Sequence, residues 1–230
     1  MKKIISILSI IVLVFINLFV LTGCGDEEDS SSRKSKKEKN AVNTSISNEV
    51  EEKVVPKIDK TPVDINNKDI YYFKINGKKF TIDNKIKDLE SIGFKQDDYY
   101  SKKEIEPNTY MTNCGNMKRT SDKYYIFSVT PVNVTDETVK CSDAKIGEFR
   151  LENMYAEKFD GTIEICNGIT LGTSMEDVEA IFGKPTSSYE GETYIKYTYQ
   201  VTMYKYFEFE FEKDTKTVHN MKWRYFDLKD

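Results

Sequence analysis

An apolar run that ends in Leu21-Thr22-Gly23-Cys24 constrains this chain more than any other feature. Two lysines precede the run, and only three polar residues interrupt it from Ile4 to Leu21. A positive start, an apolar segment and small residues at its end are the layout of an exported signal sequence with a cleavage site. The alternative is an uncleaved transmembrane helix, since the run has about the minimum length that spans a bilayer. Helix length alone would not require the small residues before the cysteine, so we favour export.

The quartet at 21–24 resembles a bacterial lipobox. The resemblance implies that residues 1–23 are a lipoprotein signal peptide and that Cys24 becomes the first residue of the mature protein. Cys24 would then carry acyl chains such as palmitate. These chains would hold the protein at the extracytoplasmic face of the cell membrane.

Residues 24–66 are predicted to form a disordered linker. An acidic and serine-rich stretch is followed by a basic cluster at 33–39, and prolines stand at 56 and 62. Such a polar segment cannot bury enough apolar surface to offset the loss of chain entropy. The basic cluster could contact anionic lipid, but a solvated spacer is the simpler interpretation.

The pattern near the C-terminus predicts a short helix over residues 174–182. Thr173 and Glu176 have the spacing of a capping box. Apolar residues then recur on one helical face. Gly183 and Pro185 mark the end of the helix, because glycine can adopt the left-handed conformation and proline prevents continuation.

Alternating residues predict three strands after this helix, at 194–201, 206–212 and 218–226. Residues 213–216 read as a turn between the second and third strands. The apolar step from Val218 to Met221 is odd-numbered, which predicts a bulge near His219-Asn220. Glutamates on one strand would face lysine and arginine on the next, and this pairing would help to set the register.

The first half of the body has a similar order of signals. Asn76-Gly77 between two apolar stretches predicts a hairpin over 71–82. A short helix is expected after Asn84, followed by strand-like segments, which are 110–114, 124–132 and 145–155. We therefore predict an α+β fold of tandem units, each a short helix packed on an antiparallel β-sheet, with units at 67–160 and 161–230. Two unrelated periodic helices are the alternative.

A family resemblance rests on residues 169–178 and on Phe182-Gly183-Lys184-Pro185, with aromatic strands beyond them. The pattern resembles the repeat of beta-lactamase inhibitory protein, and it is similar to the small SmpA/OmlA (BamE-type) lipoproteins and to lipoproteins of gut Firmicutes. The motif is structural, so it implies helices packed on a sheet and, by analogy only, an exported protein-binding role. Residues 97–166 have no counterpart in the pattern. No inhibitor contact residue can be carried over.

Few residues offer chemistry for catalysis or for a cofactor. The single histidine, His219, leaves little basis for a Ser-His-Asp or Cys-His site. Glu208, Glu210 and Glu212 alternate as on a half-exposed strand, and no EF-hand loop supports calcium binding. We expect no metal and no cofactor. Acidic residues outnumber basic ones, 38 to 34, and no basic stripe is present, so nucleic acid is not expected as a partner.

Three cysteines follow Cys24. Cys114 and Cys141 lie in strand-like stretches and could pair, which would leave Cys166 as a buried thiol. An extracytoplasmic location would permit a disulfide. Free buried cysteines are the alternative.

These patterns predict a lipid-anchored extracytoplasmic protein-binding module, inhibitor-like or active in envelope assembly, rather than an enzyme. The expected partner is an envelope or secreted protein. Helices would cover one side of each sheet and leave the other side free. On the second unit that free side would present seven residues, which are Lys196, Thr198, Tyr206, Glu208, Glu210, Lys222 and Arg224. Tyrosine beside charged groups suits a protein interface. The alternatives are a merely solvated face and a cell-envelope hydrolase that uses paired carboxylates.

Overall fold

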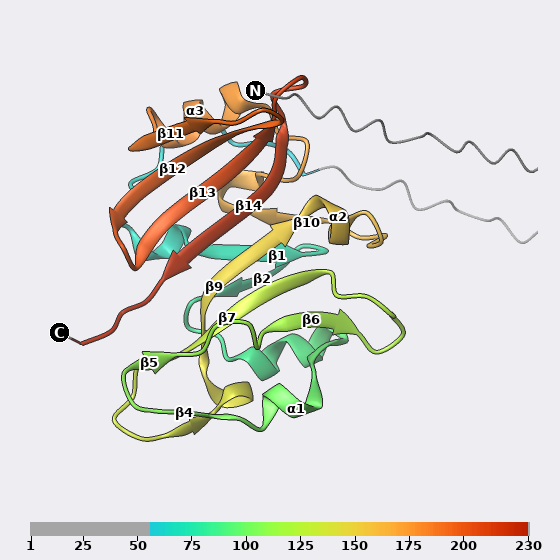
Figure 1. Ribbon diagram of the computed structural model, residues 1–230, viewed down its shortest axis with the longest axis vertical. Helices are drawn as coiled ribbons and strands as arrows, with labels where there is room; N and C mark the ends of the chain where they lie inside the picture. The colour runs from blue at the N-terminus through green and yellow to red at the C-terminus, as the bar shows by residue number, and fades with distance from the viewer. Residues whose placement is uncertain (1–55, 230) are drawn as a thin grey trace, which may run out of the picture. The chain divides into compact units, whose positions relative to one another are not determined.

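The computed structural model describes residues 56–229, and a large antiparallel sheet dominates them (Figure 1). The sheet has nine strands, which are β3 (Phe94–Gln96), β5 (Thr109–Tyr110), β6 (Asn116–Arg119), β7 (Phe127–Asn133), β9 (Lys145–Glu152), β11 (Ser187–Glu190), β12 (Tyr194–Thr202), β13 (Lys205–Glu212) and β14 (Val218–Tyr225). Their order is β11-β12-β13-β14-β9-β7-β6-β3, with β5 paired to β7. The predicted signal peptide, Cys24 and most of the predicted linker lie outside the described residues.

Two smaller sheets and several short helices complete the described part. The smaller sheets contain β1 (Tyr72–Ile75), β2 (Lys78–Thr81) and β10 (Ile163–Ile165) in the order β10-β1-β2, and the pair β4 (Glu104–Ile105) and β8 (Val139–Lys140). The α-helices are α1 (Asp98–Ser101), α2 (Asn153–Ala156) and α3 (Met175–Phe182). The 3-10 helices are η1 (Lys68–Ile70), η2 (Ile86–Ile92), η3 (Cys141–Asp143) and η4 (Cys166–Gly168).

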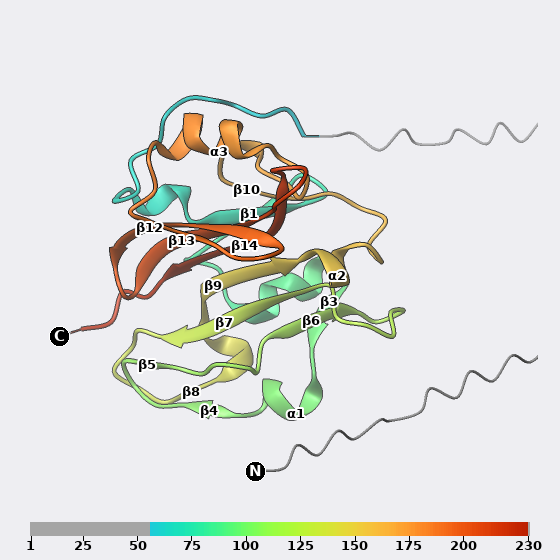
Figure 2. The ribbon, with the colours of Figure 1, turned by 45° about the horizontal axis from the view of Figure 1, so that its top comes forward.

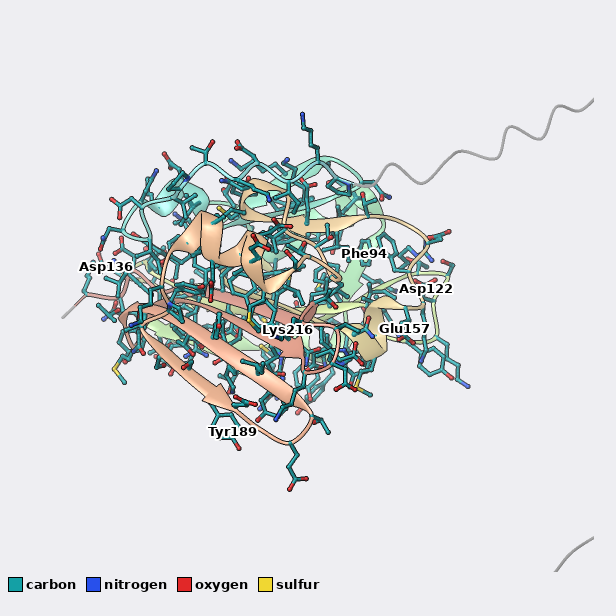
Figure 3. All side chains as sticks on the ribbon, turned by 90° about the horizontal axis from the view of Figure 1, so that it is seen from above. Phe94, Asp122, Asp136, Glu157, Tyr189 and Lys216 are labelled. Atoms are coloured by element: carbon teal, nitrogen blue, oxygen red, sulfur yellow. The ribbon has the colours of Figure 1, made fainter. Side chains whose placement is uncertain are left out.

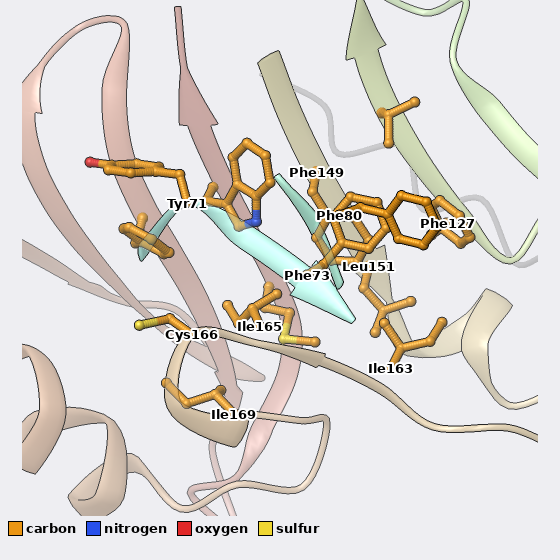
Figure 4. Close-up of a cluster of buried hydrophobic side chains, with 14 of the residues drawn as sticks. Tyr71, Phe73, Phe80, Phe127, Phe149, Leu151, Ile163, Ile165, Cys166 and Ile169 are labelled. Atoms are coloured by element: carbon orange, nitrogen blue, oxygen red, sulfur yellow. The ribbon is translucent and has the colours of Figure 1, made fainter. Parts of the chain in front are cut away.

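The three-stranded sheet and α3 cover the same face of the large sheet (Figure 2). Strand alternation turns one side chain in two toward this interface, and many of those side chains are aromatic. Phe73 of β1 stacks on Phe149 of β9, with ring centroids 4.3 Å apart. Phe182 of α3 lies 4.8 Å from the Phe207 ring. Large rings at these positions bury much apolar area, so the core lies between the layers (Figure 4).

The predicted α+β fold of tandem helix-on-sheet units is wrong. Strands make up 41% of the structure and helices 18%. Moreover, β10, from the predicted second unit, pairs with β1, and β14 pairs with β9. The sheets and the core therefore run across the predicted boundary between residues 160 and 161. The local patterns indicated single elements correctly in many places, but they carry no information on which distant strands pair.

Several local predictions are confirmed. Asn76 and Gly77 have φ values of 48° and 79°, as a type I′ hairpin between β1 and β2 requires. The bulge occurs at His219, because Glu210 faces Asn220 whereas Phe211 faces Val218.

The helix predicted at 174–182 is α3, but its cap differs from the prediction. The Ser174 hydroxyl, rather than that of Thr173, accepts a hydrogen bond from the Asp177 amide, at 3.1 Å. The Thr173 hydroxyl instead accepts from the Thr170 amide, at 3.0 Å. The side chain next to the helix therefore caps it, and Thr173 stabilises the turn before it.

Other local predictions hold less well. The helix expected after Asn84 is the 3-10 helix η2. The strand expected at 110–114 is reduced to Thr109–Tyr110, and the one expected at 145–155 gives way to α2 after Glu152.

The folded body begins before Asn67, inside the segment predicted as a linker. The Asp59 amide donates to the Asn167 carbonyl, and the Val63 amide donates to the Ile181 carbonyl, both at 3.0 Å. Ile58, Val63 and Ile65 pack against the core. These isolated apolar side chains anchor residues 56–66, although the average composition of the segment is polar.

Candidate functional site

One face of the large sheet carries three rows of polar side chains that run across its strands. Within a row, residues lie directly opposite one another on neighbouring strands. The central row is Thr198, Glu208, Lys222, Arg150, Ser128 and Asn116, and it is flanked by Gln200, Tyr206, Arg224, Glu148 and Thr130 on one side and by Tyr189, Lys196, Glu210, Asn220 and Glu152 on the other. We call these three rows the polar face. All seven residues predicted for a binding surface lie in it.

The polar face lies opposite the packed face because of strand alternation. Phe207 and Phe209 point into the core, so Glu208 between them points outward. The same holds for Lys222 between Met221 and Trp223. The tight packing on one side therefore fixes which side chains the other side presents.

Ion pairs connect the side chains across three strands. The Lys196 ammonium lies 3.5 Å from the Glu210 carboxylate and 3.9 Å from that of Glu208. The Lys222 ammonium lies 3.1 Å from the other carboxylate oxygen of Glu208. The side chains of Lys196, Glu208 and Lys222 are only 21–30% exposed. These charges are thus partly withdrawn from water and held in place by one another.

A second pair lies deeper in the face. Arg224 donates from Nε to the Glu148 carboxylate at 2.6 Å, and its terminal nitrogen lies at the same distance. The Thr130 hydroxyl donates to the other oxygen of Glu148, at 3.1 Å. The Arg224 guanidinium also lies 5.2 Å from the centre of the Tyr206 ring. Glu148 is therefore a fixed anchor that orients Arg224 against the Tyr206 ring.

The environment sets the protonation of two further groups. Burial works against the charge on Lys222, but the carboxylates of Glu208 and Glu148, together with Tyr206, raise the pKa of Lys222 above its ordinary value. Burial also raises the pKa of Tyr206, although the neighbouring cations oppose this. At neutral pH the face therefore presents a charged ammonium beside a neutral phenol that can donate a hydrogen bond.

A hollow of about 310 Å³ opens beside these residues, over β9, β7 and β6. Lys222 and Arg224 form one side of it, Arg150 and Glu152 contribute from β9, and the segment Thr112–Asn116 lies on its far side. Its lining also includes Tyr125 and Tyr155. The hollow extends the predicted surface toward a part of the chain that the sequence did not single out.

Glu148, Arg150 and Asn116 were missed because they lie in residues 97–166, which have no counterpart in the family pattern, and the strand predicted at 145–155 was not assigned to the binding surface. A signal existed for two of them. Phe149 and Leu151 alternate with Glu148 and Arg150, which is the same period that identified β13 and β14. Only the pairing of β9 with β14 shows that both sets share a face.

The remaining candidates for catalysis, metal binding or membrane insertion can also be examined in the structure. His219 is exposed at the bulge. In residues 56–229, no three His, Cys, Asp or Glu side chains come together as a metal site would require. No helix in the same part of the chain is long and apolar enough to cross a membrane. Glu148, Glu208 and Glu210 all contact cations or amides, as ion-pair partners in the polar face.

Comparison with protein families, with curated proteins and with solved structures finds no match to this chain.

Proposed function

We propose that this chain is a lipid-anchored extracytoplasmic binding protein whose polar face binds an envelope or secreted protein. The polar face is the observation that carries the proposal. A merely solvated sheet face needs no order among its side chains. Here, half-buried charges are paired across strands, so little side-chain entropy remains to be lost on binding.

The chemistry of the face favours a protein as the partner. Each row carries both signs of charge, which suits a partner that also presents both signs. Tyr206 and Tyr155 add amphipathic rings of the kind enriched at protein interfaces. The hollow beside Lys222 and Arg224 can accept side chains of the partner.

The binding surface can be tested by exchanging one ion pair. Glu208→Lys alone would place three ammonium groups together, because Glu208 contacts both Lys196 and Lys222. The double variant Glu208→Lys/Lys222→Glu keeps a pair but inverts the pattern that a partner meets. We expect it to reduce partner binding at least about tenfold, since charge reversal at an interface costs more than about 1.4 kcal/mol.

The measurement is site-specific photocrosslinking on intact cells. A photoreactive residue at Thr198 reports on the polar face, and one at Glu176, exposed on α3, is the control. We expect a discrete adduct from position 198 that the double variant loses, with unchanged circular dichroism. Equal adducts from both positions, or an adduct that the exchange leaves intact, would show that the polar face is not the binding surface.

The anchor needs a separate test because Cys24 lies outside the described residues. The proposal for it rests on the sequence from Lys2 to Cys24. We expect Cys24→Ala to abolish metabolic labelling with a palmitate analogue and to change membrane attachment or processing. Mass spectrometry of the mature N-terminus is the decisive measurement, and an unacylated chain that retains Met1 would refute the anchor.

A further inference from the structure

Two cysteines from distant parts of the sequence come together where the segment before β6 meets η3. The sulfur atoms of Cys114 and Cys141 lie 3.7 Å apart, although the two residues are 27 positions apart along the chain. Both side chains are buried. A disulfide requires the sulfurs to approach to about 2.05 Å, a movement of less than about 2 Å. We propose that Cys114 and Cys141 form a structural disulfide in the exported protein, and that it fixes the loop bordering the hollow of the polar face.

The region around the two cysteines has little other stabilisation, so a disulfide there would have a structural role. Cys114 and Cys141 belong to a small buried cluster with Ile105 and Ala144, separate from the main core. The strands β4, β5 and β8 in this region have only two residues each. Only Ile105 in this cluster has a large side chain, so the cluster contributes little hydrophobic stabilisation, and small cores commonly depend on a covalent link.

A third segment holds the two cysteines in position. The Gln96 side-chain amide, on β3, donates to the Cys114 carbonyl at 2.7 Å and lies 2.9 Å from the Cys141 sulfur. The Cys114 thiol lies 3.0 Å from the Met111 carbonyl. Gln96 is itself buried, so these contacts are not open to exchange with water. The two sulfurs therefore face each other because a side chain from β3 fixes both segments.

The pair is connected to the polar face through the chain. Gly115 and Asn116 follow Cys114 directly and line the hollow. Gly115 packs so closely on β7 that a Cβ there would lie 1.6 Å from the Val129 carbonyl oxygen. A disulfide at Cys114 would fix one end of this segment while β7 fixes the rest. The far wall of the hollow would then keep its shape when a partner binds.

The oxidation balances with an acceptor disulfide. The two thiols lose two protons and two electrons, and a bond forms between their sulfurs. The electrons reduce the disulfide of an exported thiol–disulfide oxidoreductase, or of a small disulfide such as oxidised glutathione, to two thiols. Because both sulfurs are buried, this exchange takes place as the chain folds. The inference rests on the extracytoplasmic location proposed above, where disulfides persist.

Cys166 provides an internal control. It is the first residue of η4, and burial raises its pKa to about 12. It packs in the main core, whereas Cys114 and Cys141 lie in the separate small cluster, so the fold does not place Cys166 beside either cysteine of the pair. Cys166 is therefore expected to remain a thiol under conditions that oxidise the pair.

The test uses the full chain, exported by cells and extracted in detergent after acid quenching and alkylation with N-ethylmaleimide. Mass spectrometry is expected to find a Cys114–Cys141 linked peptide, with Cys166 alkylated only after denaturation. A reductant should lower the melting temperature by about 7–14 °C, the scale expected for a link across a loop of this size. Cys166→Ser should show the same shift, whereas Cys114→Ser/Cys141→Ser should show none.

A second arm separates the inference from the proposed location. The same protein is reduced, denatured and refolded in a mixture of oxidised and reduced glutathione. Alkylation of both Cys114 and Cys141 after refolding would overturn the inference. A disulfide that forms on refolding, with free thiols in the protein taken from cells, would support the pairing and refute the extracytoplasmic location.

Discussion

Phe149→Ala is expected to lower the free energy of unfolding by about 4 kcal/mol, within the range known for Phe→Ala in a packed core. The Phe149 side chain is fully buried, and its ring stacks on that of Phe73 at an interplanar angle of 17°. It also lies 5.7 Å from the Phe127 ring and 6.3 Å from that of Trp223. Phe149 thus connects the large sheet to the three-stranded sheet, as Figure 4 shows. Removing it leaves a cavity that rigid strands on both sides cannot fill.

Urea unfolding followed by fluorescence measures this effect directly, because Trp223 is the only tryptophan and lies beside the substituted ring. Tyr189→Ala is the matched control. Tyr189 is 57% exposed on β11 and points away from the body (Figure 3), so its removal should change the stability by less than about 0.5 kcal/mol. A loss after Phe149→Ala no larger than that of the control would contradict the assigned core.

The same experiment tests whether both halves of the sequence contribute to one core and unfold together. Phe149 lies in the half that precedes residue 161, whereas Trp223 lies in the other half. One cooperative transition is expected, because aromatic side chains from both halves pack in a single cluster. Two separate transitions would instead indicate independent units.

Local elements could be predicted from the sequence because their causes are local. Asn76-Gly77 adopts positive φ angles at low cost, so the hairpin follows from two residues. The bulge at His219 follows from a break in apolar alternation over a few positions. The helix α3 follows from its apolar period and from the glycine after it.

The arrangement of those elements could not be predicted in the same way. The strand β1 pairs with β10, and Phe73 faces Ile165 across that pair. The sequence of neither strand specifies the other as its partner, because another apolar strand could pair at the same position. The apparent repeat of helix and sheet was therefore a repeat of local patterns, and strands from both predicted units pair with one another in shared sheets.

The candidate site also has a part that the sequence predicts and a part that depends on the pairing of distant strands. The part on β12, β13 and β14 could be predicted, because these strands are consecutive and joined by short turns. Glu148 and Arg150 join that surface only through the pairing of β14 with β9, across a long stretch of sequence. The hollow lies at this junction, so its shape depends on a contact between distant segments that the sequence does not signal.

Arg224→Met is expected to lower the free energy of unfolding by about 3 kcal/mol, the scale for removing one partner of a buried ion pair. Only 12% of the Glu148 side chain and 21% of the Arg224 side chain are exposed. Without the guanidinium, the Glu148 carboxylate keeps one hydrogen bond, from Thr130, and the more distant charge of Lys222, but it loses the cation in direct contact with it. The cost therefore comes mainly from a carboxylate that water reaches poorly.

A double-mutant cycle separates this cost from lost packing. Arg224→Met/Glu148→Leu removes both charges, and it should recover most of the loss because no unpaired charge remains. Arg150→Met is the matched control, since Arg150 is on the same face but its side chain is 53% exposed, and it should change the stability by no more than about 0.5 kcal/mol. Equal effects at Arg224 and Arg150 would mean that the Glu148 pair is solvated, and the polar face would then lose its rigid anchor. A recovered double variant would show that the anchor stabilises the sheet through charge compensation, so any loss of partner binding in that variant reports on the Arg224–Glu148 pair as part of the binding surface, because both residues line the hollow.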